Sequence, residues 1–158
     1  MMARIRRMRR RGQLGVAAVE LALILPILFV AMTVPLFFGR YFWHYTVAQK
    51  AAHDAARYLS TVSVREMRSS VLSATAGRIA QGIVEEELAD LLPGQEAPSI
   101  EIFCGGTKQC TGYTNTAMPE TIRVRVDLNM FDNVFGAVYT GFYGLHIGVN
   151  AEVRYVGR

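Results

Sequence analysis

The chain has 158 residues, of which 17 are basic and 13 acidic, and this length suits one domain with an accessory segment. The charge is uneven, because residues 1–15 contain six arginines and no acid, while residues 16–158 carry 11 basic and 13 acidic residues. An apolar run follows the arginines closely. They are therefore better explained as a signal that keeps the N-terminus in the cytoplasm than as a nucleic-acid-binding surface.

The apolar run is long enough to cross a bilayer. Residues 21–38 carry no charge and are rich in Leu, Ile, Val and Phe, and as a helix they span about 27 Å. A cleaved secretory signal peptide would have a shorter apolar region followed by a small-x-small site. This run instead leads into Arg40 and then a belt of aromatic residues suited to a membrane interface, Tyr41, Phe42, Trp43 and Tyr45. We predict a transmembrane helix over residues 16–40, with residues 41–158 outside.

Helix formers continue beyond the membrane segment. A stripe of small residues recurs at spacings of three and four, namely Ala48, Ala51, Ala52, Ala55 and Ala56. Such a stripe allows another helix to approach closely, although alanine also simply favours helix. We predict one stem helix over residues 16–59, a break at residues 60–63, and a second helix over residues 64–92 that ends at Pro93-Gly94. The apolar face predicted for this second helix consists of Val64, Met67, Val71, Leu72, Ile79 and Ile83.

The C-terminal third changes to a period of two. Apolar and polar residues alternate over residues 122–128 and again over residues 147–155, which predicts two strands with one face buried. Residues 100–104 form a shorter candidate strand. Between the two clear strands, aromatic residues at helical spacing suggest a short helix: Phe131, Phe135, Tyr139 and Phe142. The expected fold is α+β, with a small antiparallel sheet of about three strands.

The two cysteines, Cys104 and Cys110, both follow the membrane segment. In an oxidising compartment such a pair can close a small loop. A metal site would need further ligands, and neither His nor another Cys stands near them in the sequence. We therefore predict a disulfide and no metal.

Sequence signals for enzyme chemistry are poor. The three histidines, His44, His53 and His146, lie in different contexts, and none is part of a helical zinc pair. No glycine-rich phosphate loop precedes a helix. We predict that the protein is not an enzyme and takes no cofactor.

Glu20 interrupts an apolar stretch and needs an explanation. It could sit at headgroup depth and meet water, because an ionised group in hydrocarbon costs about 3 kcal/mol at the bilayer centre and less near an edge. Alternatively it could pair with a cation. If the chain were cut after Gly15, the new amine of Val16 would lie four residues from Glu20, on the same face of a helix. In a packed filament, a neighbouring subunit could supply the amine instead.

These residues carry a specific resemblance. A basic leader, Gly15, and a glutamate fifth in the chain that would begin at Val16 resemble a class III prepilin signal. The chain is most similar to the TadE-like minor pilins, or pseudopilins, of the tight-adherence (Tad) pilus. Further similar stretches are residues 55–60, 122–128 and 151–156.

The resemblance implies a bacterial inner-membrane prepilin that crosses the membrane once, with a cytoplasmic N-terminus and a periplasmic pilin-like domain over residues 41–158. A prepilin peptidase would remove residues 1–15. The implied partners are other major and minor pilins, an assembly platform in the inner membrane, and the bilayer. Such proteins prime, cap or regulate an adhesive fibre, and some enter the extracellular pilus. The alternative is a bitopic inner-membrane scaffold or sensor whose leader is never removed and whose periplasmic domain binds a partner.

Overall fold

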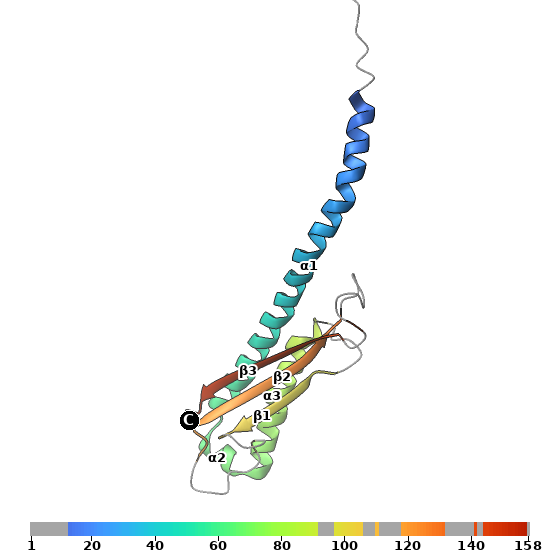
Figure 1. Cartoon of the computed structure of the whole chain (residues 1–158). Coiled ribbons are helices and arrows are strands. Elements are labelled where there is room, and N and C mark those ends of the chain that lie inside the picture. The colour runs from blue at the N-terminus through green and yellow to red at the C-terminus, as the bar shows by residue number, and fades with distance from the viewer. Residues whose placement is uncertain are drawn as a thin grey trace, which may run out of the picture. The chain divides into compact units, whose positions relative to one another are not determined.

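The computed structural model describes residues 13–91, 97–105, 110, 118–131, 141 and 144–157. Its elements are α1 (Gln13–Ser60), α2 (Val64–Arg68), α3 (Ser70–Ala89), β1 (Ser99–Cys104), β2 (Thr121–Met130) and β3 (Leu145–Arg154), as Figure 1 shows. The predicted α+β class is therefore confirmed. The chain divides into two compact units, Met1–Arg40 and Tyr41–Arg158, and each is described separately below.

In the first unit, α1 exposes apolar side chains on every side. All residues from 15 to 32 are exposed, and they include Leu23 at 67%, Ile27 at 70% and Phe29 at 68%. Among the described residues, α1 is the one helix that is long and apolar enough to cross a membrane, by length and composition. A helix that is apolar all round needs lipid or other apolar helices around it.

In the second unit, the break after α1 is built by serine caps. Ser63 is the N-cap of α2, and its side chain and backbone form a capping box with Glu66. A second break follows at Ser69, which is extended (φ −84°, ψ 122°) and caps α3 by accepting from the Leu72 N–H. The prediction of one continuous helix over residues 64–92 is therefore wrong. Serine side chains compete with the helix for backbone hydrogen bonds, and that competition favours a cap here.

The break also changes which face of α3 is buried. Met67 is buried as predicted, but Val71, Leu72 and Ile79 are 70%, 45% and 47% exposed. The buried side of α3 instead carries Ser73, Ala76, Ala80, Val84 and Leu88. The predicted apolar face is thus largely wrong, because the helix turns mostly small side chains inward, where they permit close packing.

The alanine stripe of α1 belongs to the same core. Its five members, Ala48, Ala51, Ala52, Ala55 and Ala56, are all completely buried. Lys50 of α1 forms an ion pair with Glu87 of α3 at 2.9 Å, so the two helices run side by side. Figure 1 shows this part of α1 and α3 against one face of the sheet.

The sheet has the order β1-β2-β3 with both pairs antiparallel. In the central strand, Val124 is paired with Ile102 on one side and with Ala151 on the other. The predicted inner face is confirmed for the buried residues Ile122, Val124, Val126, Leu128, Val149 and Ala151, whereas Val153 and Tyr155 are half-buried. This alternation buries one face of the sheet against the helices and leaves the other in solvent.

The chain just after β3 is bonded to the end of α1. The backbone N–H groups of Val156 and Gly157 both donate to the Ser60 carbonyl oxygen, at 3.1 and 3.2 Å. Gln49 Nε2 of α1 donates to the Asn150 carbonyl oxygen of β3 at 3.2 Å. These bonds hold β3 and the residues that follow it against α1.

Two sequence predictions lie outside the described residues. One is the short helix marked by Phe135, Tyr139 and Phe142, and the other is the helix stop at Pro93-Gly94.

Candidate functional site

Gly15 and Val16 lie within the first turns of α1. A Cβ built on Gly15 would meet no atom within 4 Å. The backbone of Gly15 does not have the positive φ that favours glycine. Neither packing nor backbone geometry therefore requires glycine at this position.

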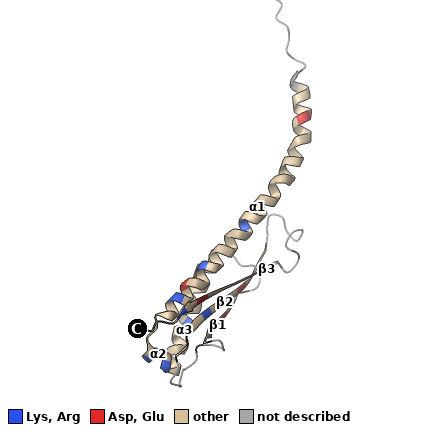
Figure 2. Ribbon diagram, turned by 60° about the vertical axis from the view of Figure 1, so that its left-hand side comes forward, with Lys and Arg blue, Asp and Glu red and all other residues tan. Residues whose placement is uncertain are grey.

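Glu20 lies in α1 four residues after Val16, so the two share one face of the helix. Its side chain is exposed and is surrounded in sequence by exposed apolar residues. Within the part of the chain that the structure describes, Glu20 forms no ion pair or hydrogen bond. Figure 2 shows how few charged residues occur along this part of α1. An acid in such a setting is suited to pairing with a cation supplied from elsewhere.

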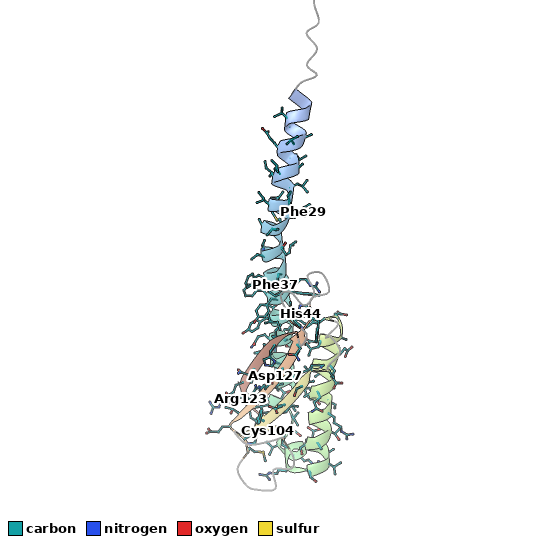
Figure 3. The ribbon with its side chains drawn as sticks, turned by 45° about the vertical axis from the view of Figure 1, so that its right-hand side comes forward. Phe29, Phe37, His44, Cys104, Arg123 and Asp127 are labelled. Atoms are coloured by element: carbon teal, nitrogen blue, oxygen red, sulfur yellow. A yellow bond between two sulfur atoms is a disulfide. The ribbon has the colours of Figure 1, made fainter. Side chains whose placement is uncertain are left out.

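The aromatic residues after Arg40 are also largely exposed. Phe42, Trp43 and Tyr45 have exposed fractions of 59%, 51% and 40%. His44, which Figure 3 labels, is buried instead, and its ring meets that of Trp43 edge to face at 5.4 Å. Exposed aromatic side chains that follow an apolar helix are typical of a membrane interface.

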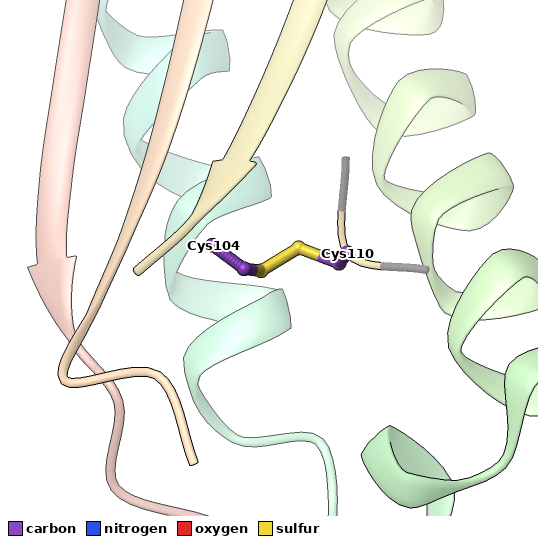
Figure 4. The surroundings of a disulfide bond; sticks show 2 residues. All are labelled: Cys104 and Cys110. Carbon is purple, nitrogen blue, oxygen red and sulfur yellow. A yellow bond between two sulfur atoms is a disulfide. The ribbon is translucent and has the colours of Figure 1, made fainter. Parts of the chain in front are cut away.

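Cys104 and Cys110 are joined by a disulfide with their Cα atoms 5.2 Å apart (Figure 4). Both cysteines are buried, at 0% and 5% exposure. The turn after Cys104 uses Gly105, whose φ of 64° suits glycine, and its N–H donates to the Thr121 carbonyl oxygen at 2.9 Å. Cys110 shares a small cavity with Gly77 and Arg78. The disulfide therefore connects the end of β1 with chain that lies beside α3.

The solvent face of the sheet carries a row of ion pairs around a hollow of about 610 Å³. Arg123 of β2 binds Glu152 of β3 at 2.7 Å, and hydrogen bonds from Arg123 and Thr121 lower the pKa of the Glu152 carboxyl. Arg125 contacts Asp127 at 2.8 Å. Figure 3 labels Arg123 and Asp127 on this sheet. These charges neutralise one another and stabilise the surface of the sheet.

Asp127 is the most enclosed acid of this row, with its side chain 17% exposed. His146 Nε2 lies 3.4 Å from one of its oxygens, and a Cβ on Gly148 would lie 2.8 Å from the same atom. Among the described residues, no group of three or more His, Cys, Asp or Glu is placed to hold a metal ion.

Sequence reasoning missed two surfaces. The ion pairs of the sheet face were not predicted, although alternating charges in both strands are a signal for cross-strand pairs. The exposed apolar side of α3 was assigned to the core. The pair Ser69-Ser70 was the available signal for the break that changes the phase of this helix.

Comparison with known proteins supports the reading of the N-terminal segment. Residues 15–57 match the family model described as TadE-like protein. A search of curated proteins and a search of solved structures found no significant match. The matched segment begins at Gly15, includes Glu20 and the alanine stripe, and ends shortly before the break after α1. Over residues 15–57 the resemblance found in the sequence is therefore confirmed, and this segment is similar to the TadE-like family.

Proposed function

We propose that this protein is a minor pilin, or pseudopilin, of a Tad or type IVb-like pilus, with a structural or assembly-initiating role in adhesion. One observation carries the proposal. The segment that matches the TadE-like family begins at Gly15. That residue lies in the first turn of an exposed apolar helix whose first acid, Glu20, follows at the spacing of a prepilin signal.

The leader has a processing role in this proposal. A prepilin peptidase on the cytoplasmic side cuts between Gly15 and Val16 and removes the six arginines. Glycine leaves the peptide bond accessible because no side chain is present before the cut. The new N-terminus is a primary amine that is positively charged at neutral pH or below.

Glu20 then supplies the complementary charge. In its own chain, the Val16 amine lies one helical turn away, and in a filament the amine of a neighbouring subunit can take its place. Pairing in apolar surroundings is favoured because an unpaired carboxylate there is costly. This ion pair between Glu20 and the Val16 amine would fix the axial position of one subunit relative to its neighbour in the filament.

The remainder of α1 fits transfer from lipid to a fibre. Its apolar side chains are equally well placed against acyl chains or against other apolar helices, so leaving the bilayer costs little once a helical bundle is available. Residues 41–158 would stand in the periplasm, where they contact other pilins and the assembly platform in the inner membrane. This role is structural and needs no catalysis.

N-terminal sequencing of the protein isolated from membranes, with its intact mass, tests the proposal. A minor pilin begins at Val16 and lacks the mass of residues 1–15. A bitopic scaffold or sensor retains the whole leader. The test should be made in cells with and without the prepilin peptidase, because cleavage should depend on that enzyme.

A further inference from the structure

We draw no further inference here: the strongest candidate, the hollow of about 610 Å³ on the solvent face of the sheet beside Arg123 and Arg125, has both arginines paired with the neighbouring acids Glu152 and Asp127, and nothing in the described part of the structure shows what covers it.

Discussion

The phenolic hydroxyl of Tyr155 donates a hydrogen bond to the backbone carbonyl oxygen of Val62 at 2.8 Å, across 93 residues of chain. This bond joins the end of β3 to the turn between α1 and α2. Together with the two bonds to the Ser60 carbonyl oxygen, it fastens the sheet to the stem helix. The position of the sheet on α1 therefore depends in part on one side chain near the C-terminus.

Replacing Tyr155 by Phe should lower the free energy of unfolding by about 1 kcal/mol, because one partly buried hydrogen bond is lost. The same residue predicts a pH dependence. Burial, with a smaller contribution from Glu66, raises the pKa of the Tyr155 hydroxyl above its usual value of 10.0. The folded state therefore favours the neutral phenol, and its stabilisation is complete below pH 10.0 and is lost as the pH rises through the higher folded value.

Urea unfolding of the full chain in detergent at pH 8 and at pH values above 10 measures both effects. The loss of stability between the two should be smaller in Tyr155→Phe than in the unaltered protein. Identical losses in the two proteins would show that Tyr155 does not carry the effect.

Replacing Val124 by Asp should destabilise the second unit by about 3–5 kcal/mol, because an unpaired carboxylate would enter the core. Val124 is completely buried in the central strand. Asn150→Asp is the matched control, since Asn150 is exposed on the neighbouring strand and should change stability by less than about 0.5 kcal/mol. Unfolding curves of the full chain in detergent decide this. If the two variants unfold alike, the assignment of the inner face is wrong.

The disulfide also serves as a test of compartment. If residues 41–158 are periplasmic, Cys104 and Cys110 should be oxidised in protein alkylated without reductant, and mass spectrometry should find neither thiol alkylated. Replacing both by Ala should cost about 2 kcal/mol, a chain-entropy value for so small a loop, and the fold should survive. Two alkylated thiols in freshly extracted protein would count against both the bridge and the periplasmic location.

Whether an element and its buried face could be predicted from the sequence depends on how that element packs. The first part of the stem helix follows from its uncharged apolar run. The later part of that helix and both long strands follow from periodicity, since each buries a regular pattern of residues. The inner face of β2 was correctly predicted from the alternation that begins at Ile122. The Gly15–Glu20 spacing is equally local, and together with the basic leader it carries the resemblance to a class III prepilin signal.

The buried face of helix α3 was harder to predict, because large apolar residues are not always the buried ones. Ala76 and Ala80 are buried where helices approach closely, whereas Leu72 and Ile79 are exposed. Which side faces inward depends on the break at Ser69 and on neighbours far away in sequence. The contact between Asp127 and Gly148 is another such case, because strand register brings these two residues together.

Glu20→Ala should separate assembly from processing. We expect the variant to be cut normally, because Gly15 and Val16 are unchanged, but to fail in supporting pili, because the amine of Val16 loses its partner. Immunoblots report the processing, and electron microscopy of cells that carry the variant in place of the native gene reports the pili. Glu20→Asp, which retains the charge on a shorter side chain, should restore piliation in part. Normal piliation with Glu20→Ala would instead place Glu20 at headgroup depth with no role in assembly.

The most direct test of the central claim is the effect of Gly15→Arg on the N-terminus of the mature protein. A bulky charged side chain before the cut should block the peptidase, and the protein should accumulate in the membrane with residues 1–15 attached. Gly12→Arg is the control, because it adds the same charge within the leader and leaves the cut site intact. N-terminal sequencing should find Val16 first in the unaltered protein and in Gly12→Arg, and the whole leader in Gly15→Arg. A Gly15→Arg protein that still begins at Val16, or an unaltered protein that keeps its leader in cells containing the peptidase, would contradict the pilin assignment.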